Sequence, residues 1–403
     1  MKVLFLANRL PHEGVAGGHR LIYRRMRRLA ERGHEVGLAS FFRPEDSDAI
    51  ASLESVLADL RTVPVRRRTV LERGLHDYVN LRLPAIFWKN HSPRLMREIG
   101  DMVERTAYDV VIAEFSEMGQ YLYRNPHLSA VRKIVSCHRC LTTSFGKYVR
   151  TTGVSPLLRL KSLSQIAPLE RYEFEMYRAM DHLLTLTPED RFSLLHYSPE
   201  LAVSVVPPGI DAGYFSRRSA PSRTDPPIIM MCGYFGEQSN HDAARWFARE
   251  TWPHVARRWP EARLHFVGRG ATESLRRLAK GDRRIVVTED VDDLRPHRER
   301  ATVFVNPMRL GSGLRIKVLE AMATELAVVS TSLGMEGIPA QNGVNCFVAD
   351  TPEMMAESIG WLLADSALRE RMGGEGRRMV EARYAEGSTT AELERVLSGV
   401  ISV

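Results

Sequence analysis

The chain has 403 residues, which exceeds the size of a single hydrophobic core and predicts two or three domains. Hydrophobic residues make up 44% and charged residues 26% of it, as in ordinary soluble globular proteins, and no apolar run approaches the ~20 residues of a membrane-spanning helix. The net charge of +7 arises within residues 1–100, which hold 18 Lys and Arg against 11 Asp and Glu. That excess suits anionic lipid or a phosphorylated acceptor, or it is the solvated face of arginine-rich helices.

The first residues, MKVLFLAN, are too few and too polar at their end for a signal peptide and predict a buried strand. The four cysteines are too few and too scattered for a disulfide framework, so we expect a cytoplasmic protein. Cys137 and Cys140 have CxxC spacing, but no second pair accompanies them, and we therefore expect no metal there.

Residues 1–41 predict the start of a parallel sheet. A strand over residues 2–7 is followed by a loop with Gly17 and Gly18, by a helix with apolar residues at helical spacing, and by a strand over residues 36–41. The loop lacks the G-x-G-x-x-G pattern of nicotinamide cofactor sites. Its paired glycines indicate either a tight turn or a close approach of backbone to a ligand, and spacing alone leaves both interpretations open.

Residues 42–105 interleave basic and apolar side chains. We predict a pair of helices that pack on the sheet with their charges outward, and a helical face lying on a membrane surface remains the alternative. Nucleic-acid binding is not expected, because no aromatic stacking platform accompanies the charges.

Further strands are predicted over residues 108–115 and 133–136, and His138 directly follows the second one. Parallel α/β sheets bind ligands at the carboxyl ends of their strands, so His138 is a candidate site residue, although a lone histidine is more often structural. The same alternation continues with helices within residues 141–180 and from the N-cap residue Thr187, and with strands over residues 182–186 and 203–206.

A stretch rich in Pro, Ser and Arg at residues 216–227 interrupts this pattern and predicts a linker. Alternating strands and helices restart at residue 228, which predicts a second domain of the same kind. We therefore expect four parts: an N-terminal domain of residues 1–206, a linker of residues 207–227, a C-terminal domain of residues 228–380 and a final helix of residues 381–403.

The most informative segment is residues 302–337, which predicts a strand, a glycine loop, a helix and a second strand in succession. Lys317 and Glu320 lie in the first turns of this helix. Free N–H groups at a helix N-terminus favour phosphate, and a cation is not placed there for helix stability alone. We predict a nucleotide-diphosphate site in which loop amides and Lys317 contact phosphate and Glu320 contacts the ribose. By itself, a glycine loop before a helix is common in α/β proteins.

The same residues carry a family resemblance. The glycine loop followed by K-x-L-E-A-M-A and by a strand ending in V-V-S-T resembles the donor site of retaining glycosyltransferases of family four, in the branch reading G-x-G-x-x-x-K-x-L-E-A-M-A. Residues 207–211 resemble the family's P-x-G-V-D element. The resemblance implies a GT-B fold: two Rossmann-like, doubly wound α/β domains that face a central cleft, with a C-terminal helix that packs back on the first domain.

The resemblance also implies site residues. It makes His138 a neighbour of the donor sugar and groups it with Lys317 and Glu320 as catalytic candidates. It implies a contact between the nucleobase and the backbone near Val291. The donor-binding candidates are Gly17, Gly18, Gly233, Val291, Gly311, Ser312, Gly313, Leu314 and Arg315.

The chain departs from the family pattern in two places. Many members carry two glutamates with seven residues between them, and here Ser312 stands at the first position while Glu320 matches the second. Many members also place an Arg and a Lys after the first strand of the second domain, and neither occurs between Gly233 and Asp242. We expect Arg309, Arg315 or Lys317 to supply the missing charge.

These observations predict a hexosyltransferase that moves a sugar from a nucleotide-diphosphate donor to a hydroxyl acceptor in glycan, polysaccharide or glycoconjugate biosynthesis, and the resemblance implies retention at the anomeric carbon. The acceptor is expected to be a lipid-linked glycan or a small molecule, with peripheral contact to the anionic inner membrane face left open. No metal or other cofactor is expected, because cations are available for the diphosphate and we see no DxD-type carboxylate pair placed to hold a metal. The alternatives are a GT-B nucleotide-sugar epimerase and a non-catalytic, basic surface-binding partner subunit.

Overall fold

In the computed structural model the chain divides into two compact units. Unit 1 comprises Met1–Pro207 and Gly387–Val403, and unit 2 comprises Pro208–Glu386. The structure describes residues 1–13, 17–65, 83–128, 130–150, 156–216, 226–291, 293–311 and 313–402, with the backbone alone at residues 45, 147–150 and 156–162.

The described part of unit 1 contains a seven-stranded sheet in the order β3-β2-β1-β4-β5-β6-β7, in which all neighbouring strands are parallel. The strand order reverses between β1 and β4, so the predicted doubly wound α/β architecture is confirmed for this unit. The strands are β1 Lys2–Ala7, β2 Glu35–Phe42, β3 Asp59–Pro64, β4 Val110–Glu114, β5 Arg132–Cys137, β6 His182–Thr185 and β7 Val203–Val205.

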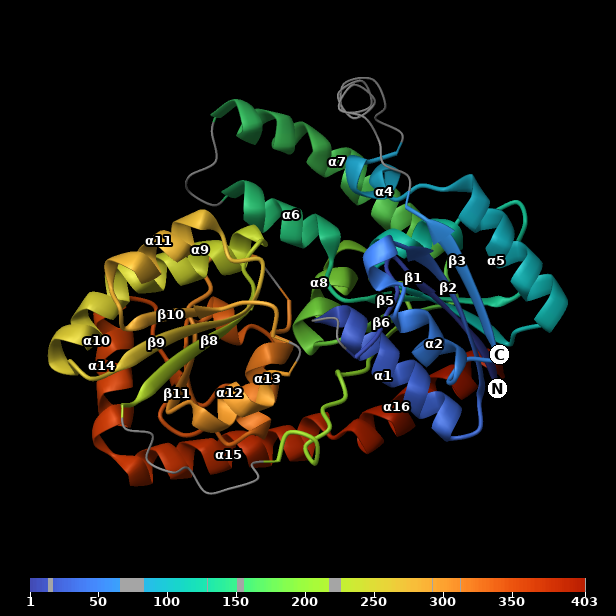
Figure 1. Cartoon of the computed structure of the whole chain (residues 1–403). Helices are drawn as coiled ribbons and strands as arrows, with labels where there is room; N and C mark the ends of the chain where they lie inside the picture. Colours follow the sequence, from blue (N-terminus) through green and yellow to red (C-terminus); the bar gives the residue numbers. More distant parts are fainter. Residues whose placement is uncertain are drawn as a thin grey trace. The chain divides into compact units, whose positions relative to one another are not determined.

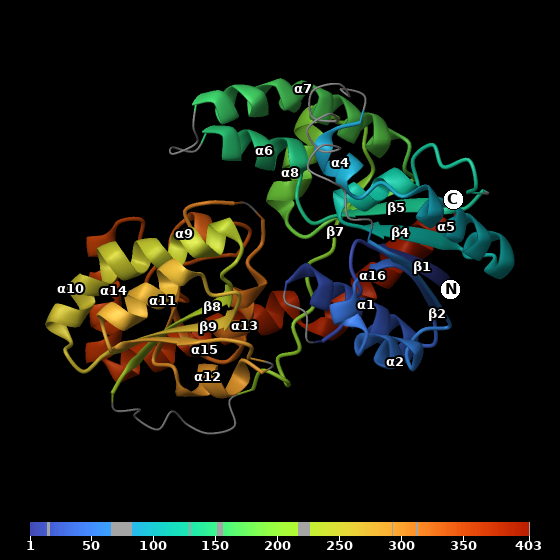
Figure 2. The ribbon, with the colours of Figure 1, turned by 45° about the horizontal axis from the view of Figure 1, so that its top comes forward.

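Helices cover both faces of this sheet, and the strand alternation assigns side chains to each. Val3 and Phe5 of β1 pack with α1, α2 and α16, whereas Leu4 and Leu6 pack with α5, α7 and α8. Figures 1 and 2 both show α6 and α7 lying side by side. The helices are α1 Gly18–Glu31, α2 Ala49–Glu54, α4 Ala85–Lys89, α5 Pro93–Thr106, α6 Leu141–Arg150, α7 Pro156–Arg178, α8 Pro188–Tyr197 and α16 Glu386–Ile401, with 3-10 turns η1 Pro44–Asp46 and η2 Ser116–Tyr121.

The prediction for residues 42–105 is wrong in one respect, because this region also contributes the strand β3. Asp59 to Pro64 pair in parallel with β2 at the edge of the sheet. An edge strand is half covered, so β3 is partly exposed and carries Arg61 on its open side. Its short, charged sequence gave no apolar run to identify it. The arginine-rich stretch of residues 66–82 lies outside the described residues.

The described part of unit 2 repeats the arrangement with a six-stranded parallel sheet in the order β10-β9-β8-β11-β12-β13. The order reverses between β8 and β11, at the position that corresponds to β1 and β4 in unit 1. The strands are β8 Ile228–Tyr234, β9 Arg263–Arg269, β10 Ile285–Thr288, β11 Val303–Asn306, β12 Ala327–Ser330 and β13 Phe347–Val348.

Two helical layers sandwich the unit 2 sheet. Apolar residues of α9, α10, α11 and α14 form one core, and those of α13 and α15 form the other (Figure 1). The helices are α9 Gln238–Trp246, α10 Trp252–Arg258, α11 Glu273–Gly281, α12 Arg295–Arg300, α13 Ile316–Ala323, α14 Pro352–Ala364 and α15 Ser366–Tyr384, with a π-helical turn η3 Phe247–Thr251 and a 3-10 turn η4 Leu333–Met335.

The chain passes between the units twice, near residues 207 and 386. Residues 208–216 belong to unit 2, where Phe215 is buried in the core beside α13. The helix α16 belongs to unit 1, where Leu393, Val396 and Leu397 are core residues and Glu394 accepts hydrogen bonds from Arg32 and His34. Among the described helices, none is both long and apolar enough to cross a membrane.

Candidate active site

The glycine loop of unit 2 lies beyond the carboxyl ends of β8 and β11, where the strand order reverses. Such a switch point leaves a crevice in which doubly wound sheets bind ligands. Gly311 and Gly313 have φ values of +93° and +86°, a left-handed conformation that side chains other than glycine rarely adopt. The amide of Gly313 donates to Glu336, 2.9 Å away, so Glu336 holds the loop in place. Ser312 lies outside the described residues.

Lys317 lies in the first turn of α13, and its ammonium group contacts α9 and the segment that follows β11. Its Nζ donates to Asn240 Oδ1 on α9 at 2.8 Å and lies 3.8 Å from Met308 Sδ. Burial lowers the pKa of Lys317 to about 8, since the charged form loses hydration there. Asn240 is itself fixed, because its Nδ2 donates to the carbonyl of Tyr234 and to Glu237. The result is a partly desolvated cation at a helix N-terminus, which suits an anionic ligand.

The two arginines that we expected as further sources of charge differ in their surroundings. Arg309 forms a bidentate ion pair with Asp242 at 2.8 and 3.1 Å, and its side chain is 44% exposed. Arg315 lies against the loop, where its Nη2 donates to the carbonyl of Leu310 at 3.4 Å. A Cβ on Gly311 would be only 3.1 Å from the Arg315 guanidinium, so the glycine makes this contact possible. Arg315 therefore remains a candidate for binding phosphate, whereas the positive charge of Arg309 is neutralised by Asp242.

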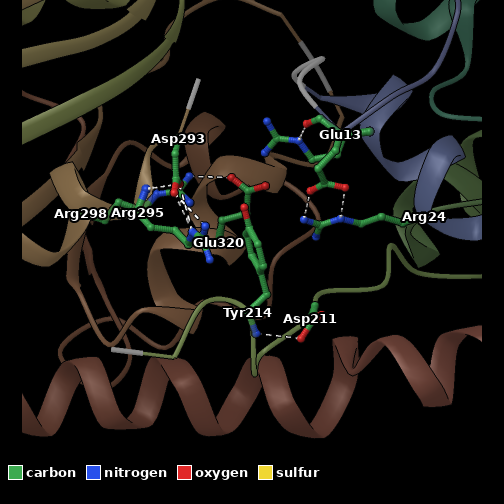
Figure 3. A network of polar contacts seen from close by, with 9 residues as sticks. Glu13, Arg24, Asp211, Tyr214, Asp293, Arg295, Arg298 and Glu320 are labelled. Carbon is green, nitrogen blue, oxygen red and sulfur yellow. Dashed lines mark hydrogen bonds and ion pairs between the residues drawn. The ribbon is translucent and has the colours of Figure 1, made fainter. Parts of the chain in front are cut away.

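Glu320 lies one turn beyond the N-terminus of α13 and forms a buried ion pair. Its Oε2 accepts a hydrogen bond of 2.5 Å from Arg298 Nη2 of α12, and the two side chains are 6% and 1% exposed. Figure 3 shows the two side chains pointing toward one another, beside the Asp293–Arg295 pair and the Tyr214 ring. Arg298 also lies 5.4 Å from the ring centroid of Phe215. This arginine partner was not predicted, and it fixes the carboxylate that we predict to contact ribose.

The other predicted donor residues of unit 2 differ in their surroundings. Gly233 is the penultimate residue of β8 and has a φ of +154°, and a Cβ there would meet the Asn240 amide at 3.3 Å. Val291 and Leu314 are partly buried against the core that includes α13. Asp290, immediately before Val291, has a φ of +54°, which turns the chain sharply after β10.

The second group of predicted residues lies at the switch point of unit 1. Gly17 has a φ of +72°, and a Cβ on Gly18 would be 2.9 Å from the Phe115 ring and 3.0 Å from His138 Nδ1. Gly17 thus forms a turn, and Gly18 lets the backbone approach the Phe115 and His138 side chains closely. The loop before it is tied to α1, because Arg24 pairs with Glu13 at 2.5 Å and Arg20 donates to the Glu13 carbonyl (Figure 3).

His138 follows β5, as predicted, and its imidazole is held on two sides. Its Nε2 is 2.8 Å from Glu114 Oε2, and its ring lies 4.2 Å from the Phe115 ring. Phe115 has a φ of +72°, a strained conformation for a residue with a bulky side chain, of the kind that gathers at functional sites. The His138 side chain is 10% exposed.

Glu114 is the last residue of β4 and is fully buried. Burial by itself favours its protonated form, but the charge of Arg25 and the hydrogen bond from His138 outweigh that effect and lower the pKa of Glu114 to about 2. Arg25 donates to Glu114 Oε1, to Ser136 Oγ and to the carbonyl of Val206, each at 3.1 Å. Neither Glu114 nor Arg25 was predicted, because both occur in segments that look like ordinary elements of the sheet and its first helix.

His19 lies on the other side of Phe115, with ring centroids 4.9 Å apart. Burial and the nearby His138 lower the pKa of His19 to about 4, so it is neutral at pH 7. Its Nε2 is 2.6 Å from Asn8 Oδ1, and Asn8 Nδ2 donates to Glu117. Asn8 directly follows β1, and the cluster thus links the strand ends on both sides of the switch point.

Cys137 and Cys140 do not form a metal site among the residues that the structure describes. Both thiols are buried, and burial raises the pKa of Cys140 to about 12 and that of Cys137 further. In the described ranges no group of three or more His, Cys, Asp or Glu side chains has the arrangement of a metal site.

The geometry of each unit matches known protein families. The model described as Glycosyltransferase Family 4 matches residues 15–214, and the model described as Glycosyl transferases group 1 matches residues 226–365. With two doubly wound sheets and these two matches, the chain belongs to the GT-B glycosyltransferases of the family-four, group-1 type. It is therefore a glycosyltransferase, and the predicted family is confirmed.

Three relatives illustrate the match. An uncharacterised 44.6 kDa protein in the cps region of Klebsiella pneumoniae is 22% identical over 368 residues, covering 89% of this chain and 90% of its own. A GDP-mannose-dependent α-(1-6)-phosphatidylinositol monomannoside mannosyltransferase of Mycolicibacterium smegmatis is 27% identical over 225 residues, covering 50% and 58%. The solved structure of sucrose-phosphate synthase from Thermosynechococcus elongatus covers all of both chains with a TM-score of 0.74 at 15% identity, which shows the shared fold.

Proposed function

We propose that this glycosyltransferase moves a hexosyl group from a nucleotide-diphosphate sugar to a hydroxyl acceptor with retention at the anomeric carbon. The observation that carries the proposal is the position of Lys317. Its ammonium group is partly desolvated, hydrogen-bonded only to uncharged atoms in the contacts described, and sits at the N-terminus of α13 beyond β8 and β11. A cation in that position favours a diphosphate.

The proposed reaction forms a bond between the acceptor oxygen and the anomeric carbon and breaks the bond from that carbon to the diphosphate. Negative charge then grows on the leaving diphosphate, where Lys317, Arg315 and the loop amides stabilise it. The departing phosphate oxygen takes the acceptor's proton, so no carboxylate nucleophile is required. Glu320 contacts the ribose, and His138 contacts the sugar. Because cations serve the diphosphate, we propose that no metal or other cofactor takes part.

The relatives support a choice of substrates to test. The Klebsiella protein is described from a cps region and the Mycolicibacterium enzyme as dependent on GDP-mannose, which supports glycan or polysaccharide biosynthesis and a nucleotide-sugar donor here. The basic excess of residues 1–100 supports a lipid-linked acceptor at an anionic membrane face, with the enzyme in the cytoplasm and held there peripherally. A small hydroxylated molecule is the other acceptor class.

The test begins with a thermal-shift screen of the full chain against UDP-glucose, GDP-mannose and dTDP-glucose. We expect at least one nucleotide sugar to raise the melting temperature, and the same donor to be hydrolysed slowly without an acceptor. Lys317→Ala should abolish the shift, while Lys280→Ala, an exposed lysine at the end of α11, should leave it unchanged.

Analysis of the products separates the remaining classes. Free nucleotide diphosphate with a transferred or released sugar of unchanged anomeric configuration supports the proposal. An epimerised sugar without an acceptor indicates an epimerase, and binding of anionic lipid without nucleotide affinity indicates a non-catalytic partner subunit. Inversion at the anomeric carbon would contradict the proposed stereochemistry while leaving the transferase class intact.

A further inference from the structure

The imidazole of His138 is bound to the protein through one nitrogen only in the contacts described. Nε2 is 2.8 Å from a carboxylate oxygen of Glu114, which is ionised and carries no proton to donate. Nε2 of His138 must therefore carry the hydrogen and donate it. In neutral His138 the lone pair is then on Nδ1, so this nitrogen is a hydrogen-bond acceptor.

The backbone of Gly18 packs closely against Nδ1 and the Phe115 ring. A Cβ on Gly18 would lie 3.0 Å from Nδ1 and 2.9 Å from the Phe115 ring, closer than ordinary contact. The Phe115 ring packs on the imidazole, with ring centroids 4.2 Å apart, at a cost in backbone strain. Nδ1 thus faces the glycine loop of unit 1 and has no hydrogen-bond partner in the contacts described.

The buried network behind His138 decides which tautomer forms. Arg25 donates to Glu114 Oε1, and His138 donates to Oε2, so each oxygen of the carboxylate has a fixed partner. Arg25 is also bonded to Ser136 and to the Val206 carbonyl, which leaves it little freedom to move. His19, the other imidazole beside Phe115, is neutral at pH 7 and adds no competing charge.

We propose that Glu114 is a positioning residue: it fixes His138 as the Nε2–H tautomer, so that Nδ1 accepts a hydrogen bond from a hydroxyl group of the carbohydrate substrate. The inference rests on the proposed function for the identity of the ligand. It goes beyond that function by naming the accepting atom and the residue that sets its protonation.

Replacement of Glu114 by Gln gives a specific expectation. Arg25 can only donate, so it selects the amide oxygen of the new side chain and turns the amide NH2 toward His138. Nε2 must then accept, and the proton moves to Nδ1. The size and polarity of the side chain are almost unchanged, but the tautomer of His138 is inverted and Nδ1 can no longer accept a hydroxyl hydrogen.

The first measurement needs no substrate. Histidine-selective 15N NMR of the full chain at neutral pH, with His138 identified by its loss in His138→Asn, should show a protonated Nε2 and an unprotonated Nδ1. In Glu114→Gln the two signals should exchange, and in the control Glu104→Gln, an exposed glutamate of α5, they should not. A wild-type Nδ1 that carries the proton, or a Glu114→Gln spectrum without the exchange, would overturn the proposal.

The second measurement adds UDP-glucose or GDP-mannose, whichever raises the melting temperature. The nucleotide sugar should shift the Nδ1 signal of His138, and nucleotide release should fall about tenfold in Glu114→Gln, as expected for one lost hydrogen bond, but not in Glu104→Gln. His138→Asn, whose amide oxygen can occupy the place of Nδ1, should keep more activity than His138→Gln.

The outcomes separate this inference from the function on which it rests. If a nucleotide sugar binds and is turned over but leaves the Nδ1 signal unmoved, or if Glu114→Gln is as active as Glu104→Gln, the inference fails and the proposed function stands. If neither nucleotide sugar binds, the proposed function fails, and the NMR of the free protein still decides whether Glu114 sets the tautomer.

Discussion

Each unit contains a buried arginine–glutamate pair near the switch point of its sheet, and the two pairs are built differently. In unit 1, Arg25 on α1 pairs with Glu114 at the end of β4. In unit 2, Arg298 on α12 pairs with Glu320 on α13. Both glutamates are almost completely buried, so both carboxylates depend on their arginine for compensation.

The difference lies in where the remaining hydrogen bonds go. Arg25 donates to three acceptors, and the second oxygen of Glu114 accepts a hydrogen bond from His138. Arg298 Nη2 donates to Glu320 Oε2 and lies 4.0 Å from Cys232 Sγ, and among the described residues its Nε is buried without a hydrogen-bond partner. The comparison teaches that the same ion pair serves as a scaffold in unit 1 and as the predicted ligand contact itself in unit 2.

The largest effect is expected from breaking the pair in unit 2. Arg298→Met leaves a buried carboxylate without its counter-charge and should lower the free energy of unfolding by ~3–5 kcal/mol. The double variant Arg298→Met with Glu320→Gln should recover much of that loss, because no charge is then left buried. Denaturant unfolding of the full chain measures both. A single variant as stable as the wild type would show that Glu320 finds other compensation.

The second-largest effect is expected from removing the charge of Lys317, which lies in the first turn of α13. Lys317→Ala should weaken binding of the nucleotide diphosphate by ~10- to 100-fold, the value of one charge-assisted hydrogen bond. Isothermal titration with UDP and GDP measures it, with Lys280→Ala as the charge-matched control. Equal affinities in the two variants would remove Lys317 from the site.

The lowered pKa of Lys317 adds a dependence on pH. The free protein loses this charge as the pH rises through about 8, so affinity for the diphosphate should fall between pH 7 and pH 9. Lys317→Arg stays charged over that range and should bind with nearly constant affinity. A wild-type affinity that does not change with pH would show that the bound anion, or another cation, sets the binding.

In unit 1 we expect the stability of the fold to decrease at acidic pH. The pKa of His19 is lowered to about 4, so the unfolded chain gains a proton first and stability is lost as the pH falls from about 6.5 to about 4. The pKa of Glu114, lowered to about 2, adds a loss that begins below its ordinary value near 4.5. His19→Gln should reduce the first loss and leave the second. Melting temperatures between pH 3 and pH 7 distinguish the two phases.

The smallest effect is expected at Arg309. Its exposed ion pair with Asp242 already neutralises it, so Arg309→Ala should change the affinity for UDP or GDP by less than about threefold. A larger loss, measured beside Lys317→Ala, would show that Arg309 leaves Asp242 when a diphosphate binds.

Structural elements with a local signal in the sequence were predicted correctly. The apolar runs of residues 2–7 and 303–305 predict buried parallel strands, and both are confirmed as β1 and β11. The strand β3 was missed, because a partly exposed edge strand has no such run. Glycine positions near residues 17 and 311 were recognisable because their backbone requires φ values that other residues avoid.

The partners of the site residues could not be predicted in the same way. Arg25 is 89 residues from Glu114, and Asn240 is 77 residues from Lys317, and both contacts exist only after the sheets have formed. Arg298 occurs in a short, highly charged segment that looks like solvent-exposed helix. Its burial follows from the packing of α12 against Phe215 and α13, which no local pattern encodes.

The last helix has a consequence for how the protein is made. Leu393, Val396 and Leu397 complete the core of unit 1, yet the ribosome adds them after every residue of unit 2. While a nascent chain still lacks α16, the core that these three residues share with α1, α2 and the sheet is incomplete. Unit 1 is thus the first unit whose synthesis begins and the last whose core is complete. Until α16 has been made, its incomplete core is a surface that chaperones can bind.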